Sequence, residues 1–281
     1  MGVWWSGSWR AGDQPVQDVA AELEGLGYGA LWSSGGFQPG LSPLFGKLLE
    51  ATSTAVVASG VVSIWAATPE TIAAAVAELQ AVHGGRFLLG LGASHAAIVP
   101  SYARPYTHMV EYLDALDAME PPLARGQRVL AALGPRMLAL AGRRGLGAHP
   151  YFVPVEHTAR ARELLGPGPL LAPEVTVVVE DDDERAAELA RAFTEGYLRL
   201  PNYAQNLRSL GFRDDELTGA GCDRLVDAVV ASGSVDDVAR RVGAHLEAGA
   251  DHVCVQVLSA ERGFPLDVYR RLAEALPVPS A

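Results

Sequence analysis

The sequence predicts an α/β protein whose alternating strands and helices close into a single (β/α)8 barrel of the TIM type. Apolar runs of strand length alternate with segments of helical periodicity, and glycines often separate the two. Such alternation requires right-handed crossovers and a parallel sheet. The 281 residues fit one barrel of about 250 residues with room for an extra segment, so we expect residues 1–281 to form one domain. An open, doubly wound sheet is the alternative, but some of the apolar runs would then have to be helices.

Three segments show the helix-to-strand unit most clearly. In each, apolar residues recur at i, i+3, i+4 and i+7, a glycine ends the helix, and an apolar run follows. The expected helices begin near Val16, after the N-cap Thr68 and after the N-cap Ser234. Their strands cover residues 30–32, 87–89 and 252–258. Further apolar runs at residues 2–5, 55–62, 129–133, 148–153 and 175–180 complete the eight expected strands.

Residues 197–217 are more numerous than a simple crossover requires. They lie between the seventh helix and the last helix-to-strand unit, and Leu207, Leu210 and Phe212 recur at roughly helical spacing. In barrel enzymes the segments that follow the strands surround the active site. We therefore expect a helical insertion near the C-terminal part of the chain that covers the mouth of the barrel. A helical pad on the barrel wall is the alternative.

Charge and composition exclude several classes of partner. The formal net charge is −11 and Lys47 is the only lysine, which opposes binding to nucleic acid. No apolar run reaches the roughly 18 residues of a membrane span. Residues 1–5 lack the basic region of a secretory signal, so we expect a cytoplasmic protein. Cys222 and Cys254 are far apart and outside any CxxC pattern, and we expect both to be free thiols.

Metal chemistry is not expected. The acidic run at residues 180–184 lies between a strand and a helix, where carboxylates cap the helix and favour its dipole. The seven histidines form no HExxH motif or other close ligand pair.

The segment at residues 86–95 is the first candidate for a functional site. Four apolar residues suit a strand covered on both faces, and Gly90 and Gly92 then let a ligand approach the backbone. Ser94 and His95 follow at the carboxyl end of the strand, where α/β enzymes place their chemistry. A tight turn, with His95 bonded only to backbone, is the structural alternative.

Two more strand ends carry polar or flat side chains. Gly134 and Pro135 join an expected strand to a helix whose first amides are unpaired, and Arg136 adds a positive charge, which together indicate an anion site. An ordinary strand-to-helix turn is the alternative. After residues 60–62, Ser63 and Trp65 place a hydroxyl and a large ring beyond another strand, although Trp65 also suits the core.

Seven segments, taken in order, resemble the luciferase-like family of (β/α)8 oxidoreductases, and in particular its branch that depends on the deazaflavin coenzyme F420. Each segment alone is unspecific, yet together they span almost the whole chain. They are residues 60–65, 84–95, 112–117, 129–136, 148–151, 171–174 and 248–252.

The resemblance implies which residues hold the cofactor. It places a segment, often with a nonprolyl cis peptide, behind the deazaflavin ring, and a second segment at the phosphate. It also implies that His95 handles a proton beside the reacting face. The expected cofactor residues are Val61, Val62, Ser63, Trp65, Gly92, Ser94, Ala131, Ala132, Gly134, Pro135 and Arg136.

The chain departs from better-known members of this branch at two places. Ser34 and Gly35 replace an Asp-His type of pair, and residues 144–147 replace a frequent Ala-Asp-Gly turn. The resemblance implies hydride transfer between F420 and a small organic substrate. A homodimer is a further expectation. An FMN-dependent monooxygenase and a degenerate barrel that binds a cofactor without turnover are the alternatives.

Overall fold

The computed structural model describes residues 1–7, 9–35, 38–261 and 263–277 and confirms the (β/α)8 barrel. Its strands are all parallel, and neighbours in the chain are mostly neighbours in the sheet. The first strands run in the order β1 (Gly2–Trp5), β2 (Ala30–Ser33), β3 (Val56–Ser59), β5 (Phe87–Gly92), β6 (Arg128–Leu130) and β7 (Gly147–Ala148).

Strands β8 (Leu170–Leu171) and β9 (Glu174–Val179) close the barrel. They are parts of one extended segment, because the connecting residues Ala172 and Pro173 also form backbone hydrogen bonds with the neighbouring strands. On one side Ala172 N donates to Ala148 O at 2.9 Å, and on the other Cys254 N donates to Pro173 O at 2.9 Å. Strand β11 (Cys254–Val257) then pairs with both β9 and β1, so the sheet returns to its first strand.

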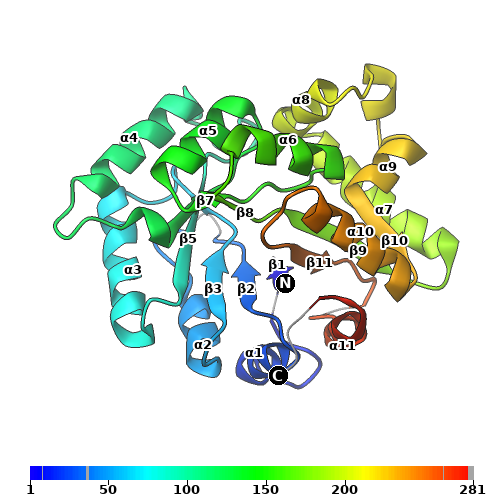
Figure 1. Cartoon of the computed structure of the whole chain (residues 1–281), viewed down its shortest axis with the longest axis horizontal. Helices are drawn as coiled ribbons and strands as arrows, with labels where there is room; N and C mark the ends of the chain where they lie inside the picture. The colour runs from blue at the N-terminus through cyan, green and yellow to red at the C-terminus, as the bar shows by residue number, and fades with distance from the viewer. Residues whose placement is uncertain (8, 36–37, 262, 278–281) are drawn as a thin grey trace.

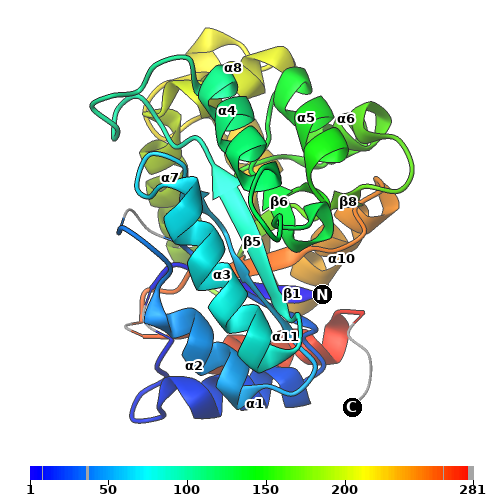
Figure 2. The ribbon, with the colours of Figure 1, turned by 90° about the vertical axis from the view of Figure 1, so that its left-hand side faces the viewer.

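Helices cover the outside of the barrel (Figures 1 and 2). Apolar side chains of both layers form the main core between sheet and helices. Asp182 accepts hydrogen bonds from the amides of Glu184 and Arg185, which confirms that the acidic run caps a helix. The helices are α1 (Val16–Gly25), α2 (Pro43–Ala51), α3 (Pro69–His83), α4 (Pro105–Asp117), α5 (Pro135–Arg144), α6 (Val155–Leu165), α7 (Asp183–Leu198), α10 (Val235–Glu247) and α11 (Leu266–Ala275).

Two expected strands differ from those observed, and one observed strand was not expected. Residues 55–62 form β3 and the short β4 (Val62–Ser63), because the chain bulges between them at Gly60 and Val61. Residues 148–153 are strand only at their start, because Pro150 has no amide hydrogen with which to continue the ladder. Strand β10 (Val230–Gly233) was not predicted, because Val226, Val229 and Val230 continue the periodicity of the preceding helix.

The expected insertion lies between α7 and α10. It contains α8 (Pro201–Ser209), the 3-10 turn η2 (Asp214–Leu217), α9 (Asp223–Val229) and β10, which pairs with β9. Leu207, Phe212 and Leu225 contribute to its separate apolar cluster, which confirms a helical insertion.

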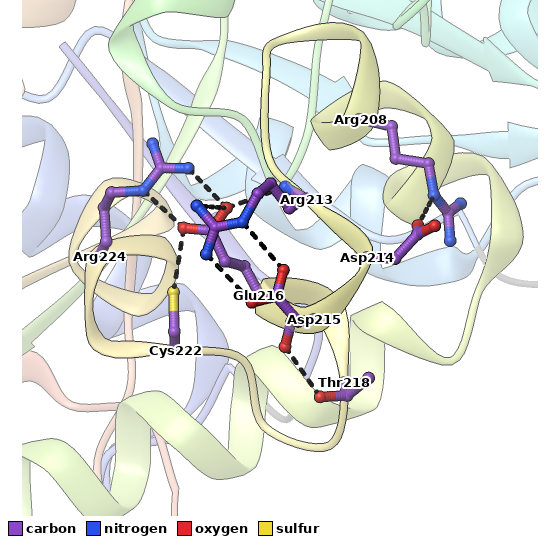
Figure 3. A network of polar contacts seen from close by, with 8 residues as sticks. All are labelled: Arg208, Arg213, Asp214, Asp215, Glu216, Thr218, Cys222 and Arg224. Carbon is purple, nitrogen blue, oxygen red and sulfur yellow. Dashed lines mark hydrogen bonds and ion pairs between the residues drawn. The ribbon is translucent and has the colours of Figure 1, made fainter.

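Figure 3 shows a polar network that joins η2 to α9 within the insertion. Arg224 of α9 donates two hydrogen bonds, of 2.8 and 2.9 Å, to the buried carboxylate of Glu216 in η2. The amide of Arg213 donates to the same carboxylate at 2.8 Å. These contacts lower the pKa of Glu216 to about 2, with the Arg224 hydrogen bonds as the largest cause. Glu216 is therefore ionised at neutral pH and joins η2 to α9.

Candidate active site

The bulge, residues 60–61, lies where the third strand of the barrel reaches the carboxyl end of the sheet, which we call the mouth. The peptide between Gly60 and Val61 is cis, at the position that the resemblance implies. A β-carbon at Gly92 would overlap the side chain of Val61, and one at Gly90 would overlap the carbonyl of Ser59. The side of each glycine on which a β-carbon would stand is therefore filled by the neighbouring strand, and the approach of a ligand to their backbone stays a prediction.

Two buried polar atoms without a described partner face the bulge from inside the barrel. Nε1 of Trp4 and Nε2 of His149 have no hydrogen bond, and both would lie close to a β-carbon at Gly60. Nδ1 of His149 donates to the carbonyl of Ala172 at 2.7 Å, so Nε2 is the lone-pair acceptor. Burial lowers the pKa of His149 to about 4. A free donor and a free acceptor thus lie beside the bulge on the inside of the barrel.

His95 and Ser94 follow β5 at the mouth. Ser94 adopts a left-handed φ of 57°, and its buried hydroxyl has no partner among the described atoms. Nδ1 of the partly buried His95 lies 2.7 Å from Oδ1 of Asn202 in α8. Because an amide oxygen only accepts, Nδ1 carries the proton and Nε2 remains a free base. Burial lowers the pKa of His95, against a smaller raising effect of the Asn202 hydrogen bond.

Trp65 lies next to Ser63, but its ring faces a different hollow from the other predicted residues. Its indole Nε1 donates to the carbonyl of Ala93 at 2.7 Å, and its ring stacks on His108 with centroids 4.2 Å apart. Together Trp65 and His108 line a hollow of about 390 Å³, in which none of the other predicted cofactor residues takes part. The hydroxyl of Ser63 accepts a hydrogen bond from the amide of Trp65 at 3.3 Å, so it serves its own loop.

Residues 131–136, which we call the amide turn, connect β6 to α5. No described atom accepts a hydrogen bond from the amides of Ala132, Leu133, Gly134 or Arg136. Gly134 is the N-cap of α5 and offers no side-chain cap, so the positive end of the helix dipole is open. The guanidinium of Arg136 lies 4.2 Å above the ring of Tyr106 and is exposed. Consecutive free amides of this kind bind anions.

Aromatic side chains from the end of α7, from α8 and from the segment after β7 pack together near the mouth. Tyr197 donates a hydrogen bond of 2.8 Å to the hydroxyl of Tyr151, which donates one of 2.9 Å to Oε1 of Gln256 in β11. Tyr203 of α8 packs edge-on against Tyr197 and lies 5.3 Å from the His95 ring. In Figure 2, α8 lies beyond the arrowhead of β5, and the contacts of Asn202 and Tyr203 with His95 place α8 against the residues that follow β5.

A carboxyl group without a described cationic partner lies near these tyrosines. Glu174, the first residue of β9, is fully buried and accepts a hydrogen bond of 2.5 Å from the hydroxyl of Thr176. Desolvation raises the pKa of Glu174 to about 8, against the lowering effect of its hydrogen bonds. Glu174 is therefore mostly protonated at pH 7.

The sequence pattern does not reveal this part of the site. Tyr151 follows a strand too short to show a periodic pattern, and Tyr197 and Asn202 reach the mouth only through the tertiary position of the insertion. The one available signal was the prediction that residues 197–217 cover the mouth.

Other features of the described residues lie outside this arrangement. A hollow of about 620 Å³ lies at the carboxyl ends of β9 and β11, and no predicted cofactor residue lines it. No group of three or more His, Cys, Asp or Glu residues in the described chain is placed to hold a metal ion. Within the same residues, no helix is both long and apolar enough to cross a membrane.

The fold defines a (β/α)8-barrel protein with unpaired polar groups at the carboxyl ends of its strands. The chain belongs to the luciferase-like monooxygenase family, because the family model matches residues 12–129 and 120–252. No curated protein sequence matches it.

Solved structures share this fold. An F420-dependent secondary alcohol dehydrogenase, in complex with an F420-acetone adduct, is 15% identical with a TM-score of 0.73, and the alignment covers 99% of this chain and 98% of that one. The F420-dependent tetrahydromethanopterin reductase of Methanopyrus kandleri is 16% identical with a TM-score of 0.66 over 98% and 97% of the two chains. The oxygenating constituent of 3,6-diketocamphane monooxygenase of Pseudomonas putida, in complex with FMN, is 17% identical with a TM-score of 0.66 over 99% of each chain.

Proposed function

We propose that this member of the family is an oxidoreductase that uses coenzyme F420 to exchange a hydride with a small organic substrate at the mouth of the barrel. The amide turn carries the proposal, because four unpaired amides and an uncapped helix start fit the phosphate of such a cofactor. The buried hydroxyl of Ser94, Nε1 of Trp4 and Nε2 of His149 are unpaired and fit a ring with polar edges. When bound, the deazaflavin supplies the redox chemistry.

The residues of the chain would bind the cofactor, cover the mouth and exchange a proton. The amide turn and Arg136 would hold the phosphate, and the bulge with Val61 and Val62 would back the ring. Nε2 of His95 is a free base that can accept a proton at neutral pH. Tyr197 and Tyr203 reduce access of water to the mouth, which strengthens the polar interactions beneath them.

FMN-dependent monooxygenation is the second candidate. The likeness to the FMN-bound monooxygenase motivates it, and the amide turn suits either phosphate. The resemblance of the seven sequence segments favours F420. A barrel that binds the cofactor without turnover also remains a distinct alternative, because Ser34 and Gly35 offer no acid or base at the second strand.

Parallel titrations of the purified protein with F420 and with FMN test the proposal. We expect saturable binding of F420 that is at least tenfold tighter than that of FMN. Preference for FMN supports the monooxygenase, and failure to bind either cofactor rejects both proposals. Binding of F420 without electron transfer to or from a panel of alcohols, lactols, imines and enones supports the non-catalytic barrel.

A further inference from the structure

His157 on α6 is a buried histidine that touches the amide turn. It is 1% exposed, and its Nε2 lies 2.9 Å from the carbonyl oxygen of Leu133. A carbonyl oxygen only accepts, so Nε2 carries the proton. Nδ1 has no partner among the described atoms. Burial lowers the pKa of His157, so the ring is neutral at pH 7 and donates this one hydrogen bond.

This hydrogen bond fixes the orientation of the next amide. The peptide between Leu133 and Gly134 is not among the cis bonds of the chain. In a trans peptide the C=O and the following N–H point in opposite directions. Because His157 holds the carbonyl of Leu133 on the α6 side, the amide of Gly134 points away from α6.

The orientation matters because nothing else holds this amide. Gly134 N has no described acceptor, and it is one of four unpaired amides in the turn. Gly134 also has no β-carbon, and no other atom lies within 4 Å of where one would be. The carbonyl of Gly134 is held by the amides of Met137 and Leu138, whereas the peptide between Leu133 and Gly134 has one described hydrogen bond, which comes from His157.

We propose that His157 is a positioning residue for the anion-binding amides and thereby sets the affinity for the phosphate of the cofactor. This inference rests on the proposed function, since it assumes that a phosphate-bearing cofactor binds the amide turn. His157 itself touches neither cofactor nor substrate. Its substitution removes the orientation of one amide-to-phosphate hydrogen bond, which corresponds to an affinity loss of roughly tenfold.

The test compares phosphate-bearing and phosphate-free ligands in matched variants. Dissociation constants are measured for F420 and its phosphate-free deazaflavin nucleoside, and for FMN and riboflavin. His157→Leu lacks the donor, whereas His157→Gln retains one. His245→Leu is the control, because His245 is also buried and neutral but bonds to Thr158 instead of the turn. Thermal unfolding of each variant verifies that it folds.

We expect His157→Leu to weaken binding of the phosphate-bearing ligand about tenfold and binding of the phosphate-free ligand less than twofold. His157→Gln should recover most of the loss, and His245→Leu should bind both ligands like the wild type. Equal losses for both ligands, or no loss for either, would overturn the inference.

A second measurement does not depend on the identity of the cofactor. In 15N-labelled protein, the amide resonance of Gly134 should shift on addition of inorganic phosphate in the wild type and in His157→Gln, and much less in His157→Leu. An insensitive Gly134 resonance in the wild type, or an equal shift in all three, contradicts the inference. If the resonance responds as expected but neither F420 nor FMN binds, the proposed function fails and the positioning role of His157 stands.

Discussion

Asn202 of α8 and His95 at the end of β5 are 107 residues apart in sequence, and their side chains are joined by a hydrogen bond of 2.7 Å. This contact links the insertion to the residue that the sequence marks for proton handling. It also decides which nitrogen of His95 is free, because the amide oxygen of Asn202 accepts the proton of Nδ1. One side chain of the insertion thus both covers the mouth and orients the candidate base.

Removal of this link should loosen α8. In Asn202→Ala we expect faster amide hydrogen exchange across residues 197–217, because the hydrogen bond between α8 and β5 is lost. Bound cofactor should slow exchange in the same segment of the wild type if it acts as a lid. The outer helices α1 and α2 provide the internal control. Unchanged exchange in both comparisons would mean that the insertion is a fixed pad on the barrel.

His95 should matter more for turnover than for binding. We expect His95→Ala to keep F420 affinity within a few-fold and to lose about 10²-fold in rate, the usual scale for one general acid or base. His95→Gln retains hydrogen bonding but transfers no proton, so its rate should also stay low. Both rates are measured with a substrate that the wild type converts. Full activity of either variant removes His95 from the mechanism.

Gly134 provides a direct test of the amide turn. Its φ of −85° is open to any residue, and no atom lies within 4 Å of a β-carbon at this position. Gly134→Val should therefore fold normally while its branched side chain obstructs the unpaired amides, and F420 affinity should fall at least tenfold. Fluorescence titration and thermal unfolding measure the two effects. A folded variant with affinity within twofold of the wild type would exclude the turn as the phosphate site.

Arg136 is expected to add charge to the same site. The exposed guanidinium stacks on Tyr106 and has no carboxylate partner among the described residues. Arg136→Ala should weaken binding of F420 several-fold more than binding of its phosphate-free nucleoside. The difference should shrink at high salt because exposed charges are screened. Equal losses for both ligands would assign Arg136 a structural role through its contact with Tyr106.

The sequence predicted elements whose signals are local. The N-caps Thr68 and Ser234, the capping role of the acidic run at residues 180–184 and the glycine that ends α3 are set by neighbouring residues, and the structure confirms them. The bulge could not be located from periodicity, because Val61 and Val62 continue an apolar strand pattern. Its position followed only from the resemblance to a known family.

The site residues that the sequence did not predict were missed for a different reason. Tyr151, Tyr197 and Gln256 lie far apart in sequence. Only the tertiary structure brings the hydroxyl of Tyr151 within 2.8 Å of the Tyr197 hydroxyl and within 2.9 Å of Oε1 of Gln256. His157 has the helical periodicity of an ordinary buried residue, and its bond to Leu133 depends on how α6 packs beside α5. Such roles require a tertiary structure.

Glu174 gives the last prediction, which concerns stability and pH. Its pKa is about 8 in the folded protein, raised mainly by burial from an ordinary value of 4.5. Below pH 4.5 the group is protonated in both states. Between these two values the folded protein keeps a proton that the unfolded chain releases, so this group's contribution to stability declines as pH rises, by at most about 1.4 kcal/mol per pH unit. Glu174→Gln is neutral throughout and lacks this decline. The melting temperature of Glu174→Gln relative to wild type should therefore increase steadily from pH 5 to pH 8, whereas a constant difference over that range would show that Glu174 is already ionised in the folded state.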